Sequence, residues 1–220
     1  MLAQRPRELG SWDITKLKGP AKWTCFHVYV ILDVFSRYVV GWRLAPQESA
    51  LLAHDLIAAT CDHEGMVPGQ LTLHADRGTS LRSKPVAMRL ADLGVTKSHR
   101  RPYFSDDNPY SESQFKTLKY QPDFPPRFDS IEHARAFCQA FFAWYNHEHR
   151  HSAIGYMTPA AIHYGQAQHL HAARQTVLDE AFRLPPARFT QRHPAPPPLP
   201  TAVGINWPKH TPNAVADAMR

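Results

Sequence analysis

The chain has 220 residues, of which 43% are hydrophobic and 20% charged. That is enough for one domain with a substantial core, and it excludes a disordered tail. No apolar run approaches the roughly 18 residues that span a bilayer, and the first residues lack the apolar segment of a secretion signal. Three scattered cysteines cannot build a disulfide framework, so we expect a protein of the reducing cytoplasm.

The charge balance favours an anionic partner. Lysine and arginine number 25 against 19 acidic residues, which gives a formal net charge of +6, and 14 histidines can add charge near a polyanion. Nucleic acid is the partner that this favours most. Many proteins carry a modest positive excess, however, so charge alone is weak evidence.

Hydrophobic patterns in the first half of the chain predict a mixed α/β fold. The predicted order is three meandering antiparallel strands, a helix, a strand, a helix and a strand. The β-branched run at residues 26–34 is typical of a central strand. The other predicted strands are 11–15, 38–45, 71–76 and 95–99, and the predicted helices are 48–63 and 83–93.

The second half reads as helical. Asn108 followed by Pro109 predicts a helix start, with asparagine as the N-cap residue and proline at the first helical position. Asp129 and Glu132 resemble a capping box that opens a long helix, and Thr158 precedes a short one. From Leu184 onward nine of the 20 prolines occur within 37 residues, so we expect an irregular tail.

Three acidic residues occupy positions from which they can converge. Asp13 lies within the first predicted strand, Asp76 ends the fourth, and Glu112 lies in the first turns of the helix that Asn108 opens. Carboxylates from separate elements are the hard oxygen ligands that Mg²⁺ or Mn²⁺ requires. Two such ions about 3.5–4 Å apart activate an attacking oxygen and stabilise a leaving oxygen at phosphorus. The pattern therefore suggests cleavage or transfer of phosphodiesters.

Each acid also has an ordinary structural interpretation. An aspartate at a strand end is usually a turn or cap residue, and Glu112 with Lys116 is a common helix-surface pair. Asp33 competes with the three acids because it ends the second strand, although the turn that follows explains it as a capping residue. Asp106 and Asp107 also compete, although their position just before Asn108 lets Asp107 support the loop or favour the positive helix N-terminus without touching metal.

The spacing and the residues of several motifs resemble those of a known family. Asp76 and Glu112 are separated by 35 residues, as in the Asp, Asp, 35 residues, Glu signature of the DDE transposase and retroviral integrase superfamily. The segments that resemble the integrase core of bacterial insertion-sequence transposases, between residues 11 and 165, are WDIT at 12–15, LDVFSRYVVGW at 32–42, HADRGTS at 74–80, DDNPYSESQFKTLK at 106–119 and YNHEHRHSAIGYMTP at 145–159.

This resemblance implies a fold, a reaction and a site. The fold is a ribonuclease H-like mixed five-stranded sheet flanked by helices, with an α-helical C-terminal extension. The reaction is divalent-metal-dependent strand cleavage and strand transfer during DNA integration. Asp13, Asp76 and Glu112 would be the catalytic, metal-binding triad, and two Mg²⁺ or Mn²⁺ ions are expected.

Basic residues near these acids are candidate DNA contacts. Lys116 and Lys119 share a helix face with Glu112, and the resemblance implies that they contact DNA near its reactive end. Arg100 and Arg101 lie in the loop before that helix, where a basic and aromatic segment suits a DNA backbone. The HxHxH tract at 147–151 resembles a metal site, but the spacing favours a helix end and DNA-side surface over zinc.

We divide the chain into a disordered lead-in at 1–10, a catalytic core at 11–127, a helical part at 128–168 and an extension with a proline-rich tail at 169–220. The resemblance implies an end-recognition region ahead of the core, and we expect this chain to be a catalytic module without it. Expected partners are therefore DNA, further copies of the chain on DNA, and an upstream helix-turn-helix protein or reading frame. The alternative function is a catalytically silent fragment that binds DNA or an intact transposase, and a nuclease without transfer activity ranks lower.

Overall fold

The computed structural model describes residues 1–75, 90–99, 108–184, 189 and 193–205. Within these residues a mixed sheet of five strands, in the order β4-β3-β2-β5-β6, forms the centre of the fold. β2, β3 and β4 pair antiparallel, whereas β5 pairs parallel with β2 and with β6. The strands are β2 (Leu9–Lys18), β3 (Cys25–Asp33), β4 (Val39–Ala45), β5 (Thr72–Ala75) and β6 (Thr96–His99). The predicted meander and the mixed five-stranded sheet are confirmed.

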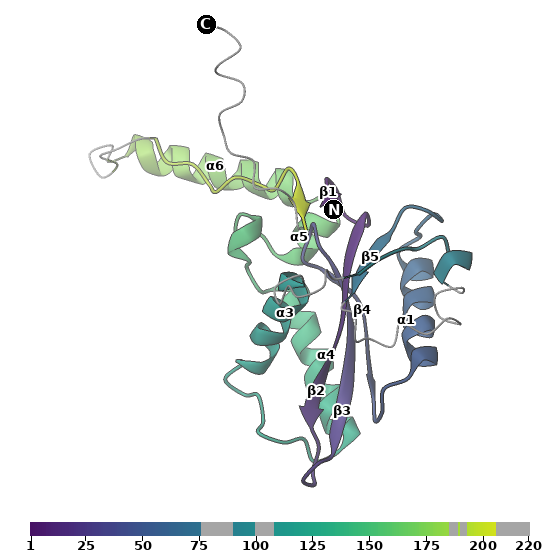
Figure 1. Cartoon of the computed structure of the whole chain (residues 1–220). Helices are drawn as coiled ribbons and strands as arrows, with labels where there is room; N and C mark the ends of the chain where they lie inside the picture. Colours follow the sequence, from purple (N-terminus) through teal and green to yellow (C-terminus); the bar gives the residue numbers. More distant parts are fainter. Residues whose placement is uncertain (76–89, 100–107, 185–188, 190–192, 206–220) are drawn as a thin grey trace, which may run out of the picture.

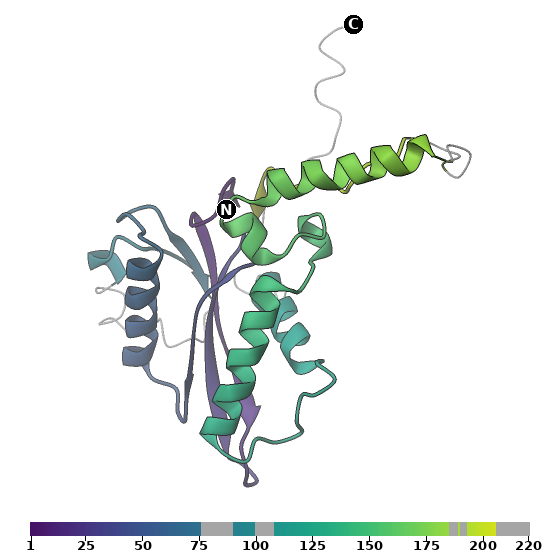
Figure 2. The same ribbon diagram turned by 180° about the vertical axis from the view of Figure 1, so that it is seen from behind.

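Helices cover both faces of this sheet. α1 (Ala50–His63) lies on one face, and α3 (Pro109–Lys119) and α4 (Ile131–His147) lie on the other (Figures 1 and 2). Side chains on a strand alternate between the faces, so Trp12 joins the cluster under α1 while Leu17 joins the cluster under α3 and α4. The two buried clusters explain why β3, which contributes to both, is almost entirely apolar.

The end of the described chain returns to its beginning. α5 (Pro159–His163) is followed by α6 (Ala167–Arg183), a helix that projects away from the sheet (Figure 1). The chain then runs back along α6 to β7 (Val203–Gly204), which pairs antiparallel with β1 (Leu2–Ala3). The predicted disordered lead-in is therefore wrong: Ala3 is fully buried, and the long-range pairing that holds it cannot be read from local sequence.

Local sequence signals predicted helix ends correctly, but they did not predict every N-cap residue. α3 begins at Pro109 after Asn108, and α1 ends before Gly65, both as predicted. The N-cap residue of α4 is Ser130, whose hydroxyl accepts a hydrogen bond from the backbone N–H of His133 at 3.1 Å. The proposed capping box at Asp129 was thus one residue too early. Most of the predicted helix 83–93 lies outside the described residues, and within them no helix is long and apolar enough to cross a membrane.

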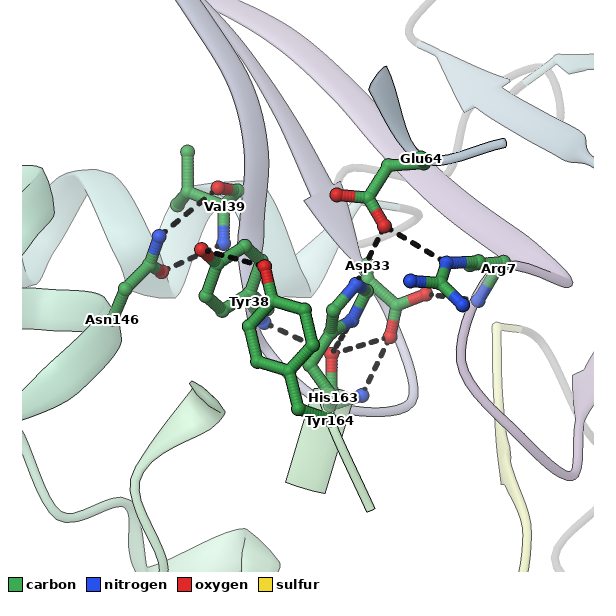
Figure 3. Close-up of polar contacts among 9 residues, drawn as sticks. Arg7, Asp33, Tyr38, Val39, Glu64, Asn146, His163 and Tyr164 are labelled. Carbon is green, nitrogen blue, oxygen red and sulfur yellow. Dashed lines mark hydrogen bonds and ion pairs between the residues drawn. The ribbon is translucent and has the colours of Figure 1, made fainter. Parts of the chain in front are cut away.

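A buried polar network attaches α5 to the core (Figure 3). Glu64, the residue that ends α1, lies 2.8 Å from the ring of His163 in α5 and accepts a hydrogen bond from Arg7 Nε at 2.8 Å. Burial raises the pKa of the Glu64 carboxyl, but these two hydrogen bonds outweigh it and hold the pKa at about 2. Asp33 accepts hydrogen bonds from the Ser36 hydroxyl and from the Arg7 backbone, which confirms its predicted role in the turn.

Candidate active site between strand β2 and helix α3

Asp13 lies on the face of β2 that α3 covers. Ser11 and Leu17, at even spacings from it, both point to that side, where Ser11 touches α3 and Leu17 enters its hydrophobic cluster. The Asp13 side chain is partly exposed, and its Oδ1 accepts a hydrogen bond from the backbone N–H of Ile14 at 2.8 Å. The carboxylate is therefore oriented by its own strand while remaining open to solvent.

Glu112 lies on the outer face of α3. Phe115 and Leu118 from the same helix are 7% and 0% exposed, whereas Glu112, Lys116 and Lys119 are exposed. This is the division that helical spacing predicts, with the acid and both lysines on one face. The sequence prediction for the faces of this helix is confirmed.

A chain of buried hydrogen bonds fixes α3 against β2. The Ser111 hydroxyl lies 2.5 Å from the Ser11 hydroxyl, which itself donates to Oδ1 of Asn108. The Asn108 amide group in turn donates to the carbonyl oxygen of Trp12 at 3.2 Å. Trp12 precedes Asp13 and Ser111 precedes Glu112, so this chain joins the two peptide segments that carry the acids.

The charge of Lys119 links the outer face of α3 to Asp13. Although Lys119 is exposed, loss of hydration lowers the pKa of its ammonium group, and the opposing effect of the Asp13 carboxylate is smaller. An opposite charge shifts a pKa in this way only when it is close. The Asp13 carboxylate on the sheet therefore acts electrostatically on the Lys119 ammonium group on the helix.

The register of β5 brings a third segment to the same level of the sheet. β5 pairs parallel with β2 over four residues, and the last pair is Ala75 with Trp12. Asp76, the next residue in the chain, lies outside the described residues, as do Arg100, Arg101 and both competing acids at 106 and 107. Within the described part of the chain, no group of three His, Cys, Asp or Glu side chains is placed to hold a metal ion.

The histidine tract has structural contacts of its own. The ring of His149 stacks on Tyr145 with centroids 5.4 Å apart, and His151 Nδ1 accepts the backbone N–H of Ala153 at 3.3 Å. Burial lowers the pKa of His151 to about 4, helped by the positive charge of Arg37. These contacts agree with the helix-end interpretation of the tract.

Sequence reasoning missed the residues that connect the two acid-bearing segments. Asn108 was interpreted as a helix cap, yet its side chain makes no capping hydrogen bond. Ser11 and Ser111 went unnoticed because serine is common in every context. The available signal was that Ser11 lies two positions from Asp13, and hence on the same strand face.

Comparisons with known proteins show which families and relatives this chain is similar to. Two family models, both described as integrase core domain, match residues 3–105 and 93–159. The transposase for insertion sequence element IS904 of Lactococcus lactis is 29% identical over 158 residues, which are 71% of this chain and 61% of that protein. Transposase InsF for insertion sequence IS3A of Escherichia coli is also 29% identical over 71% of this chain, and 54% of that protein is covered. The chain thus spans only a little over half the length of these relatives.

Solved structures agree on the fold. The simian T-cell lymphotropic virus intasome in complex with PP2A regulatory subunit B56 gamma gives a TM-score of 0.55 at 18% identity, covering 73% of this chain and 55% of that one. The HTLV-2 integrase catalytic core domain in complex with magnesium gives a TM-score of 0.53 at 16% identity, covering 72% of this chain and 97% of that one. The fold is therefore the ribonuclease H-like fold of retroviral integrase catalytic cores. The two family models described as integrase core domain together match the chain from residue 3 to residue 159, and the fold agrees with that match.

Proposed function

We propose that this chain is the catalytic core of a DNA transposase, in which Asp13, Asp76 and Glu112 hold divalent cations and carry out strand cleavage and strand transfer. The observation that supports this most is the hydrogen-bonded connection between β2 and α3, because it brings two of the three acid-bearing segments together. The insertion-sequence relatives are named as transposases, which agrees with the proposal.

The sheet register supports Asp76 as the third acid of the proposal. Ala75 is paired with Trp12, and the residues that follow them are Asp76 and Asp13. Continuation of the parallel register by one residue would put the two aspartates side by side on the same face of the sheet.

The donor set suits Mg²⁺ or Mn²⁺. Asp13 and Glu112 offer carboxylate oxygens, which hard divalent cations prefer, and Asp13 is partly exposed. When bound between such carboxylates, the cations would supply charge stabilisation at phosphorus and lower the pKa of an attacking water or 3′-hydroxyl. The HTLV-2 integrase catalytic core domain, a structural neighbour at 16% identity, is described in complex with magnesium.

The basic face of α3 would position the DNA. Lys116 and Lys119 are exposed on the same face as Glu112, one and two turns further along the helix. A phosphodiester held at the acids has its flanking phosphates within reach of such side chains, because DNA phosphates contact lysine ammonium groups readily. Arg100 and Arg101 would extend this contact from the preceding loop.

A strand-joining assay tests the proposal. Purified chain, Mn²⁺ and DNA carrying the ends of the parent element should yield joined products, and Asp13→Asn, Asp76→Asn or Glu112→Gln should each reduce joining by at least 100-fold. Asp123→Asn, at an exposed acid beyond α3, is the matched control and should retain full activity. Unimpaired joining by any of the three triad variants would refute the assignment. DNA binding without joining by the unaltered chain would favour the catalytically silent fragment, and nicked but unjoined products would favour a nuclease.

A further inference from the structure

Asn108 has a buried side chain that is used for something other than its expected role. As the N-cap residue of α3 it is expected to accept a hydrogen bond from the first turn of its own helix, yet it makes no such bond. It is 1% exposed, and both ends of its amide group point toward β2. The side chain therefore contributes to how the helix is attached rather than to how the helix starts.

The hydrogen bonds have a consistent direction. Ser11 has one hydroxyl hydrogen, which it donates to Oδ1 of Asn108, so the Ser111 hydroxyl must be the donor in its contact with Ser11. The Asn108 amide nitrogen completes the chain by donating to the Trp12 carbonyl. Ser11 and Ser111 are both fully buried, so water cannot replace either partner.

We propose that Asn108 is a positioning residue that sets the separation of Asp13 and Glu112, and thereby the affinity for divalent cations. This inference rests on the function proposed above. Trp12 precedes Asp13 in β2, and Glu112 lies one helical turn after Asn108, so a shift of α3 along β2 moves one carboxylate relative to the other. Groups that orient metal ligands typically change metal affinity by about 10–100-fold when they are removed.

The rival explanation is that Asn108 matters only as a helix-starting residue. Serine is about as good an N-cap residue as asparagine, but its side chain is too short to reach from α3 to both Ser11 and Trp12. Asn108→Ser therefore keeps the capping preference and removes the connection to β2. Ser130→Ala provides the opposite control, because Ser130 makes a true capping hydrogen bond at the start of α4.

The experiment is calorimetric titration of Mn²⁺ into the full chain and its variants, with circular dichroism to check folding. Asn108→Ser and Asn108→Ala should each weaken Mn²⁺ binding by at least tenfold, while Ser130→Ala should lower the melting temperature and leave the Mn²⁺ affinity within twofold. If Asn108→Ser binds Mn²⁺ within twofold of the unaltered chain, the positioning role is refuted.

Two further variants keep the outcome decisive. If Asn108→Ser does not fold, Ser111→Ala removes the far end of the same hydrogen-bond chain and must show the tenfold loss instead. Asp13→Asn tests the underlying site in the same titration. Full Mn²⁺ affinity in Asp13→Asn would overturn the proposed function, whereas loss there with none in the Asn108 and Ser111 variants would overturn only the positioning role.

Discussion

The ring of His163 in α5 and the carboxylate of Glu64 at the end of α1 lie 2.8 Å apart, with side chains that are 0% and 2% exposed. These residues are 99 positions apart in the chain, and their contact holds the C-terminal helical segment on the sheet (Figure 3). Removing the Glu64 carboxylate would leave the buried His163 ring and the Arg7 guanidinium without this hydrogen-bond partner, which is costly.

Glu64→Gln should destabilise the chain and change how its stability depends on acid. The folded-state pKa of Glu64, about 2, lies below the ordinary value of 4.5, so its contribution is present above pH 4.5 and is lost as the pH falls toward 2. We expect a loss of about 3 kcal/mol at neutral pH and a flatter dependence between pH 4.5 and 2, measured by urea unfolding. Glu180→Gln, at an exposed position on α6, should change neither the stability at neutral pH nor its dependence on pH.

His151→Gln should weaken the dependence of stability on pH in a second, higher pH range. Burial and the charge of Arg37 hold the folded-state pKa of His151 near 4, below its ordinary value of 6.5. Neutral His151 therefore contributes stability above pH 6.5, and this is lost as the pH falls through 4. Urea unfolding should show a smaller acid-induced loss between pH 6.5 and 4 in His151→Gln than in the control His169→Gln. Equal slopes in both variants would mean that His151 is not shielded as described.

Asn146 should prove to be a stability residue of α4. Its amide group accepts from the backbone N–H of Val39 at 2.9 Å and donates to the Val39 carbonyl at 3.0 Å, which pins α4 to β4 (Figure 3). Asn146→Leu leaves both buried backbone groups unpaired, so we expect a loss of about 2–4 kcal/mol in chemical denaturation. Gln139→Leu, on the exposed side of the same helix, should cost less than about 0.5 kcal/mol.

Lys116→Ala and Lys119→Ala should weaken DNA binding without regard to sequence. Each contact to a phosphate releases about one counterion, so each variant should reduce the slope of log K against log salt by roughly 0.9. Fluorescence anisotropy with a labelled duplex over a range of salt concentrations measures this slope. Lys22→Ala removes another exposed lysine, near the β2–β3 turn, and should leave the slope unchanged. An unchanged slope in both α3 variants would remove these lysines from the DNA interface.

Much of the fold was predictable because its signals are local. Strand alternation, a proline-marked helix start at Asn108 and the helical spacing of Glu112, Lys116 and Lys119 each depend on a few neighbouring residues. The contacts that sequence reasoning missed are long-range: β1 with β7 and Ser11 with Ser111 join positions about 200 and 100 residues apart. Such contacts carry no local signature, since their hydrogen bonds are formed only when the whole sheet is assembled.

In the candidate site, too, only the features that depend on neighbouring residues were predictable from the sequence. The spacing of Asp76 and Glu112 indicated the acids, and helical periodicity indicated which face carries Glu112. The use of the Asn108 side chain was not predictable, because asparagine before proline is explained equally well by capping, and only the position of β2 decides between the two roles.

Metal-directed backbone cleavage tests the central claim most directly. Fe²⁺ substituted for Mg²⁺, with ascorbate and peroxide, generates radicals that cut the chain close to the bound ion, and the cuts can be mapped by mass spectrometry. The cuts should cluster around residues 13, 76 and 112, be suppressed by excess Mg²⁺ and be lost in Asp13→Asn. Cuts confined to one of these three segments, or scattered cuts that Mg²⁺ does not suppress, would show that the three carboxylates do not share a cation.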